Sequence, residues 1–137
     1  MEHITETSTL KAPAERFTGD VYLNPIEAPS APACLASGLV RFTPGARTNW
    51  HSHAKGQVLY VTDGIGLVGT RDGEVARITA GDIVKCPAGE EHWHGGTDTT
   101  LMAHIAIVVG DESGDGTTWL EPVTDEQYKT ALAAVSR

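Results

Sequence analysis

Four side chains of types that bind metal ions lie in two short segments of the chain. His51 and His53 are two residues apart, Gln57 follows four residues later, and His92 lies further along. In an extended strand successive side chains point to opposite faces, so positions 51, 53 and 57 project to the same side. Three donors from one strand do not complete a metal shell, and His92 on a neighbouring strand is the obvious fourth. We therefore expect a first-row divalent metal ion inside a small β-barrel.

The donor set determines the chemistry of such a site. Imidazole nitrogen binds zinc, iron, manganese, cobalt, nickel and copper, while the amide oxygen of Gln57 is a weaker, neutral ligand. Three imidazoles and one amide leave the positive charge of the ion uncompensated, and one or two coordination positions stay open. The site should act as a Lewis acid toward polarised oxygen or nitrogen groups. The alternative is that His51 and His53 are surface histidines near a turn, because an HxH pair alone is a weak signal.

Two further histidines have spacings that bear on the same site. His94 follows His92 by two residues, so it points the same way and is expected beside the ligands or at the rim of a pocket. His104 lies in the apolar segment 101–109, on one face with Val108. If that face looks into the barrel, His104 is a candidate catalytic acid or base, because its ordinary pKa of about 6.5 is close to a working pH. A core histidine with satisfied hydrogen bonds is the equally weighted alternative.

Length, charge and cysteine content restrict the class of protein. The chain of 137 residues fits one domain, and its net charge of −8 argues against nucleic-acid binding, which needs clustered Lys and Arg. Residues 1–20 hold no apolar core of the kind found in a secretory signal, and no run is apolar enough to span a membrane. We therefore expect a cytoplasmic protein. Cys34 and Cys86 are too few and too far apart for a disulfide framework, so inert thiols are expected.

Short strands separated by turn residues dominate the middle of the chain and would carry these side chains. Asp63-Gly64 is predicted to end one strand, and Asp72-Gly73 favours a hairpin with a type I′ turn, in which both central residues have positive φ. The predicted strands cover 37–43, 57–62, 65–70, 74–79, 83–86 and 101–109. The strand 101–109 has apolar residues on both faces, so each face is expected to pack against another part of the protein or a second copy. This pattern predicts an all-β barrel or sandwich.

The two ends of the chain differ from this middle part. Residues 1–32 are polar and interrupted by prolines, which predicts an arm that lies along the barrel or on a partner subunit. Residues 33–123 are assigned to the barrel and residues 124–137 to a short C-terminal helix, within one domain overall. Thr124 and Gln127 fit a capping box at the start of this helix. We expect the helix to pack on the outside of the barrel.

Glycines and a proline around the four ligands complete two motifs of a known superfamily. One set resembles the first cupin motif, with Gln in place of the usual Glu: Gly45, His51, His53, Gln57 and Gly64. A second set resembles the second cupin motif, with Gly in place of the usual Asn: Gly81, Pro87, Gly89, His92 and Gly96. The resemblance covers about residues 40–109 and implies the jelly-roll barrel, or double-stranded β-helix, of the cupins. It also implies that the three histidines and Gln57 ligate the metal.

A closer resemblance is to the small bacterial cupins that include manganese-dependent hydroxynitrile lyases. It is carried by the stretches 42–53, 89–95, 102–107 and 123–128. The resemblance implies a manganese ion, with iron, zinc, cobalt and nickel as alternatives. It implies reversible cleavage of an α-hydroxynitrile to a carbonyl compound and cyanide, a lyase reaction on a carbon–carbon bond. His104 would move the proton in that reaction.

The substrate pocket is the last feature that the sequence addresses. Val40 and Thr48 match pocket-lining positions of the lyases, and His94 is expected at the same pocket. Val108 stands where the lyases have a Gln, so this chain lacks one polar group of theirs. Leu59 and the other apolar residues expected in the lumen predict a small, partly apolar substrate.

Functions other than a lyase are compatible with these residues. They are an iron-dependent cupin dioxygenase, a sugar-acid isomerase and a non-catalytic domain that binds a small ligand. The partners expected are a small-molecule substrate and further copies of this chain, with neither nucleic acid nor a membrane. A homodimer or homotetramer is expected because cupins commonly associate through sheet faces and the segment 101–109 needs cover on both sides.

Overall fold

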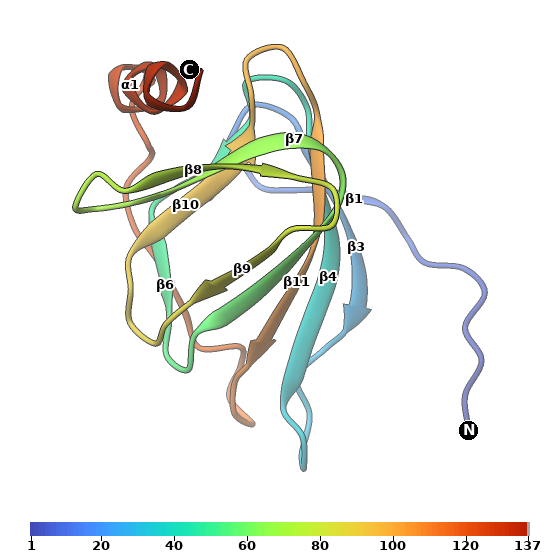
Figure 1. Cartoon of the computed structure of the whole chain (residues 1–137). Helices are drawn as coiled ribbons and strands as arrows, with labels where there is room; N and C mark the ends of the chain where they lie inside the picture. Colours follow the sequence, from blue (N-terminus) through green and yellow to red (C-terminus); the bar gives the residue numbers. More distant parts are fainter. Residues whose placement is uncertain (137) are drawn as a thin grey trace.

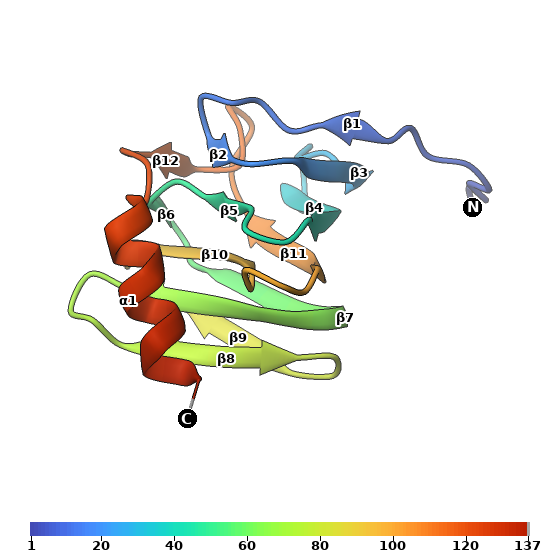
Figure 2. The same cartoon turned by 90° about the horizontal axis from the view of Figure 1, so that it is seen from above.

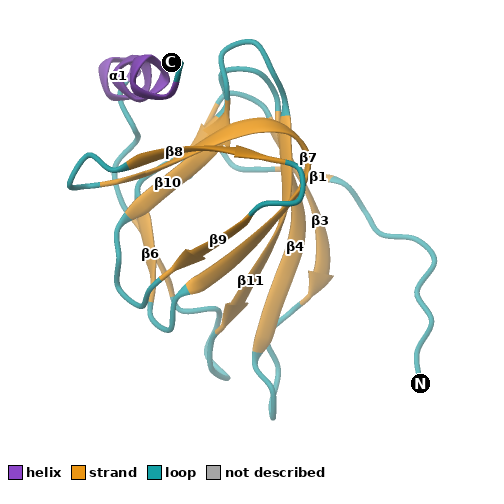
Figure 3. Cartoon of the chain, viewed as in Figure 1, coloured by secondary structure: helices purple, strands orange, loops and turns teal. Residues whose placement is uncertain are grey.

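Two sheets that share one long strand, β7 (Gln57–Thr70), form the body of the protein in the computed structural model, which describes residues 1–136 (Figure 1). Strands and their short connections account for most of the chain, with one helix near the C-terminus of the described residues (Figure 3). The other elements are β1 (Leu10–Lys11), β2 (Phe17–Thr18), β3 (Val21–Glu27), β4 (Leu35–Phe42), β5 (Arg47–Thr48), β6 (His51–His53), β8 (Val75–Thr79), β9 (Ile83–Cys86), β10 (His92–Gly96), β11 (Met102–Val109), β12 (Thr117–Trp119) and α1 (Asp125–Val135). The predicted all-β barrel with a short C-terminal helix is confirmed.

The strands are antiparallel, and β7 belongs to both sheets. Its first half pairs with β9 and β11, and the first sheet continues from β11 through β4 and β3 to β1. Its second half pairs with β8 and β10, and the second sheet continues from β10 through β5 to β2. The short strand β6 pairs with β10 on one side and with β12 on the other. The two sheets therefore curl around a common interior, which is where the inward-facing side chains of β6, β7, β10 and β11 meet.

The strand β7 differs from the sequence prediction, which divided it into 57–62 and 65–70. Asp63-Gly64 does not end the strand, which continues to Thr70. Gly64 adopts φ +75°, so the strand bends there but is not interrupted. The pairing of β11 with β7 shifts register at the same place. The turn after β7 also differs from the predicted type I′ form, because the Gly73 N–H donates to the Thr70 carbonyl oxygen and the central residues, Arg71 and Asp72, do not have positive φ. The hairpin itself is present as β7–β8.

The N-terminal arm is part of the barrel rather than a separate extension. Strand β3 pairs with β4 along most of its length, and β1 pairs with β3 at the outer edge. Strand β2 closes the opposite edge of the second sheet against β5. The residues before β1 run away from the barrel in an extended form (Figure 1). Of the two predicted placements, the structure shows the arm along the barrel of its own chain.

Buried apolar side chains form two clusters. One contains side chains from both sheets and consists of Val21, Val40, Phe42, Ala46, Val61, Val68, Ile78 and Met102. The other lies under the helix and consists of Trp50, Leu67, Trp93, Val123, Tyr128 and Ala131. Because both clusters are apolar and lie on either side of one sheet, they fix that sheet between the interior and the helix.

The helix α1 lies across the outside of the second sheet, as predicted (Figure 2). Thr124 is its N-cap: its side chain accepts a hydrogen bond from the Gln127 N–H, and the Gln127 side chain accepts one from the Thr124 N–H. The predicted capping box is thus confirmed. The buried guanidinium of Arg47 donates to the Val123 carbonyl oxygen at 2.9 Å and to the Asp125 carboxylate at 2.8 Å, which ties the start of the helix to β5. With eleven residues α1 is too short to cross a membrane, and the described residues offer no other candidate helix.

Candidate metal centre and cavity

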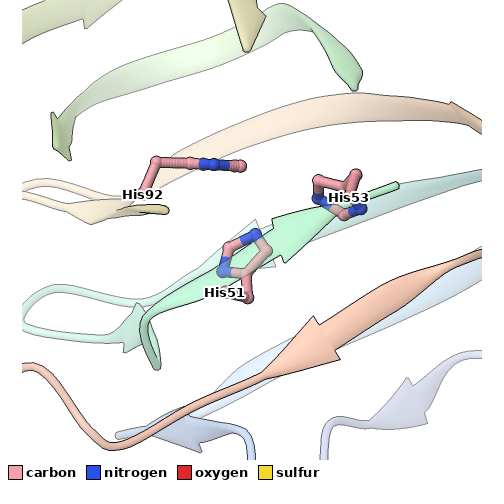
Figure 4. A group of neighbouring side chains, drawn as sticks. All are labelled: His51, His53 and His92. Atoms are coloured by element: carbon pink, nitrogen blue, oxygen red, sulfur yellow. The ribbon is translucent and has the colours of Figure 1, made fainter. Parts of the chain in front are cut away.

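Three imidazole rings converge from two paired strands. His51 and His53 project from the same face of β6, and His92 lies directly opposite His51 in the register of β6 and β10. Figure 4 shows the three rings turned toward a common space. Their ligand atoms lie within 4.8 Å of one another, and the residues are 1%, 4% and 1% exposed. The alternative of surface histidines is therefore wrong for this pair.

Each of the three rings is held through its Nδ1 atom. The partners are the Asn49 carbonyl oxygen for His51 (2.9 Å), the Thr117 hydroxyl for His53 (3.0 Å) and the Glu90 carbonyl oxygen for His92 (3.0 Å). A carbonyl oxygen can only accept, so Nδ1 carries the proton in His51 and His92. Their Nε2 lone pairs are then available. Fixing the tautomer in this way is how proteins present histidine to a metal ion.

Gln57 supplies the fourth donor from β7. Its Oε1 atom lies 3.1 Å from His92 Nε2. Because the proton of His92 is on Nδ1, these two atoms are both acceptors, and a cation between them removes their repulsion. The Nε2 atom of His53 is buried and has no hydrogen-bond partner among residues 1–136. These orphaned acceptors fit a divalent cation, and the donor set of three nitrogens and one oxygen suits a first-row metal.

Burial keeps the ligating rings neutral. Desolvation lowers the pKa of His51 well below its ordinary value, with the neighbouring His92 adding to the effect. Desolvation, followed by His92, lowers the pKa of His53 to about 4, and desolvation also lowers the pKa of His92. Neutral imidazole is the ligating form, so these rings are ready to bind a metal ion at neutral pH without first losing a proton.

A cavity of about 310 Å³ opens beside the metal centre. His51, His53 and Gln57 line it at the metal end, and His94 and His104 line it at the side. Its apolar walls include Leu23, Val40, Ala106, Val108 and Trp119. Glu27 and Asp115 contribute carboxylates to the lining. A small molecule with an apolar part can therefore bind with a polar group directed at the metal.

Four of the five predicted pocket residues line this cavity, namely Val40, Thr48, His94 and Val108. Leu59 does not. It is fully buried and projects from the same face of β7 as Gln57, but it is not among the lining residues. Alternation along a strand predicts that a side chain points inward, and it does not predict how far along the barrel the cavity extends.

His94 and His104 form a buried pair. His104 Nε2 lies 2.9 Å from His94 Nδ1, and His104 and His94 are 0% and 4% exposed, respectively. Their outer nitrogens, His94 Nε2 and His104 Nδ1, are buried and have no hydrogen-bond partner in the described part of the chain. Desolvation lowers the pKa of His104 to about 4, and desolvation, followed by the neighbouring His104, lowers the pKa of His94 well below its ordinary value. The pKa of His104 therefore lies below the ordinary value of about 6.5, because its ring is shielded from solvent.

Sequence reasoning missed the strand β12, which supports the metal centre. Thr117 pairs with His53 and bonds its ring, and Trp119 pairs with His51 and stacks on it with ring centroids 4.7 Å apart. Thr117 and Trp119 are two residues apart, as His51 and His53 are, so each pair lies on one face of its strand. Nothing in the local sequence connects residue 53 to residue 117, so the pairing could be found only in the structure.

Comparison with known proteins agrees with this fold and site. The family model described as the cupin domain matches residues 38–109, and the chain belongs to this family. An (R)-mandelonitrile lyase from Granulicella tundricola is 47% identical over 121 residues, which cover 87% of this chain and 90% of that protein.

Solved structures show the same architecture. A cupin-like protein from Thermotoga maritima superimposes with a TM-score of 0.85 at 34% identity, covering 95% of this chain and 97% of that one. The polyketide cyclase RemF from Streptomyces resistomycificus has a TM-score of 0.70 at 15% identity, covering 94% and 91%. At that identity the second likeness concerns the fold alone.

Proposed function

We propose that this protein is a metal-dependent lyase that cleaves α-hydroxynitriles reversibly into a carbonyl compound and cyanide. The observation that carries the proposal is the arrangement around the cavity: three anchored imidazoles and one amide converge at one end, and a buried pair of neutral imidazoles lies at the side. The 47% identity to a mandelonitrile lyase supports this reaction over other cupin chemistry.

His51, His53, Gln57 and His92 would hold the metal ion, which we propose to be manganese. When bound, the ion supplies Lewis acidity toward the oxygen or nitrogen of the substrate. The protein contributes neutral ligands only, so the charge of the ion is not reduced by a carboxylate. Trp119 and Thr117 keep the rings of His51 and His53 in place while substrates enter and leave.

The pair of His94 and His104 would move the proton. Because their inner nitrogens share one hydrogen, either His94 Nε2 or His104 Nδ1 bears a free lone pair. That nitrogen atom takes the proton of the substrate hydroxyl, and the oxygen forms the carbonyl double bond. The bond between the carbonyl carbon and the nitrile carbon breaks, and the electron pair of this bond leaves with cyanide. The proton then passes from the pair to cyanide, so hydrogen cyanide leaves and the pair is restored.

The remaining cavity residues would orient the substrate. The Thr48 hydroxyl accepts a hydrogen bond from the His94 backbone N–H at 3.2 Å, and its own proton can donate to a bound oxygen. The apolar walls formed by Val40, Ala106 and Val108 would hold the hydrocarbon part of the substrate. Because Val108 offers no hydrogen bond, we expect aldehydes and ketones with apolar rather than polar substituents.

The test is cyanide release from mandelonitrile by protein loaded with manganese. We expect activity that is lost with a chelator and in His53→Ala, and retained in His3→Ala, a matched exposed histidine outside the cavity. His104→Gln should keep its metal and cleave about 100-fold more slowly or worse. Oxygen consumption by the iron-loaded protein without cyanide release, or the absence of turnover with any metal, would overturn the proposal.

A further inference from the structure

A cysteine lies directly behind the metal centre. Cys86 ends β9 and is the register partner of Gln57 on β7. Partners in antiparallel strands place their side chains on the same face of the sheet, so Cys86 follows Gln57 into the barrel. It is 5% exposed. The second cysteine, Cys34, precedes β4 and is half-buried.

Cys86 belongs to a second group of ligand atoms that shares one histidine with the first. The Cys86 sulfur, a Glu90 carboxylate oxygen and a His92 ring nitrogen lie within 4.8 Å of one another. Ligand atoms around a tetrahedral ion are about 3 to 4 Å apart, so small side-chain movements would close this group around a cation. Glu90 is half-buried near the end of the loop that joins β9 to β10.

We propose that Cys86, Glu90 and His92 form a second metal position, which takes thiophilic divalent ions such as cadmium or zinc in competition with the three-histidine centre. Burial raises the pKa of the Cys86 thiol to about 12, so the thiol is protonated in the metal-free protein and would release its proton to solvent only when sulfur binds the ion. A thiolate and a carboxylate then neutralise the double positive charge, whereas the three-histidine centre has only neutral ligands. Soft ions prefer sulfur, while manganese prefers oxygen and nitrogen, so the two positions select different metals.

His92 makes the two positions mutually exclusive. Its Nδ1 donates to the Glu90 carbonyl oxygen, which leaves Nε2 as the one ligating atom of that ring. An ion bound to Cys86 and Glu90 through His92 therefore removes one imidazole from the other centre. We therefore expect cadmium or zinc to release manganese from the protein although neither ion binds all four ligands of the three-histidine centre.

The direct test is titration of the metal-free full-length protein with cadmium. We expect a sulfur-to-cadmium charge-transfer band in the ultraviolet at one ion per chain. The band should disappear in Cys86→Ser and persist in Cys34→Ser, the matched control. Absence of the band in the unmodified protein, or its survival in Cys86→Ser, would overturn the proposal.

Competition supplies a second readout that does not depend on lyase activity. Manganese bound to the protein is followed by its electron paramagnetic resonance signal while cadmium is added. In Glu90→Gln, which alters a half-buried loop residue and leaves the thiol in place, the cadmium concentration that releases half of the manganese should rise about ten-fold. The same rise is expected in Cys86→Ser. Equal release from all three proteins would show that cadmium simply replaces manganese on the histidines, and would refute the second position.

Discussion

At the candidate metal centre, hydrogen bonds to Nδ1 determine which way each imidazole ring directs its other nitrogen. His53 depends on the Thr117 hydroxyl, a side-chain partner on a different strand, whereas His51 and His92 bond to backbone carbonyl oxygens. A backbone partner is not removed by a substitution, but the Thr117 hydroxyl is. The ring of His53 is therefore the one whose orientation can be tested by mutation.

Thr117→Val should weaken binding of the metal ion, which we propose to be manganese, about ten-fold, because the isosteric side chain fills the space but cannot fix the His53 ring. Titration calorimetry on the metal-free protein measures this change. Thr118→Val is the control, since Thr118 is the exposed neighbour on the same strand. Equal affinities in the two variants would mean that packing alone holds the ring.

The buried His104 ring links stability to pH. Its pKa is about 4 in the folded protein and about 6.5 when it is exposed by unfolding. Between these values the unfolded chain binds more protons, so the free energy of unfolding falls as the pH is lowered from about 6.5 to 4. The difference corresponds to roughly 3 kcal/mol for this one ring. In His104→Gln the metal-free protein should lose less stability over that range, as measured by denaturant unfolding at a series of pH values. The same pH slope in both proteins would contradict this prediction.

The part of the site that the sequence predicts is carried by two short segments. Strand alternation groups His51 and His53 on β6, but the prediction that Gln57 continues the same strand is wrong, because a turn at residues 54–56 separates β6 from β7. The motif spacing, and not alternation, is what groups Gln57 and His92 with the pair. Thr117 and Cys86 could not be grouped with them, because they reach the same centre through strand pairings between distant segments. The lowered pKa of His104 was also missed, since desolvation depends on what surrounds a ring in three dimensions.

At the scale of elements, β7 is the strand on which both sheets depend. Its bend at Gly64 redirects the chain from the first sheet to the second. A Cβ atom at this position would collide with the Leu101 carbonyl oxygen, in addition to the cost of positive φ. The sequence pattern identified the glycine but indicated the end of a strand, because a turn signal does not distinguish a bend inside a strand from its end.

Gly64→Ala should lower the free energy of unfolding by about 3 kcal/mol or more, because the alanine must move backbone atoms as well as adopt a strained φ. Gly89→Ala is the matched control: its φ is +78°, and an added Cβ would meet no atom of the described residues within 4 Å. Its cost should be about 1 kcal/mol. Chemical denaturation measures both. Similar losses in the two variants would show that the contact with Leu101 relaxes freely.

For the whole molecule, the outer face of the first sheet is apolar although the chain carries a net charge of −8. Tyr60 pairs with Ile83 on one side and Ile105 on the other, and Val58 pairs with Ile107. Tyr60 is 46% exposed and Ile83 is 60% exposed. We propose that this face binds the same face of a second copy. Two acidic chains repel each other over most of their surfaces, and this largely apolar face, where Lys85 pairs with Val58 and these paired residues include no carboxylate, is where they can approach.

Carboxylates placed in that face should prevent association, because each copy would bury a charge against an apolar surface without a partner. We expect the unmodified protein to have the mass of a dimer or a larger oligomer in size-exclusion chromatography with light scattering. The double substitution Tyr60→Glu and Ile107→Glu should give a monomer with unchanged metal content. Leu101→Glu is the control, since Leu101 is 51% exposed but lies in the connection before β11, outside the apolar face. A monomeric unmodified protein at high concentration, or a double variant of unchanged mass, would show that this face does not bind a second copy.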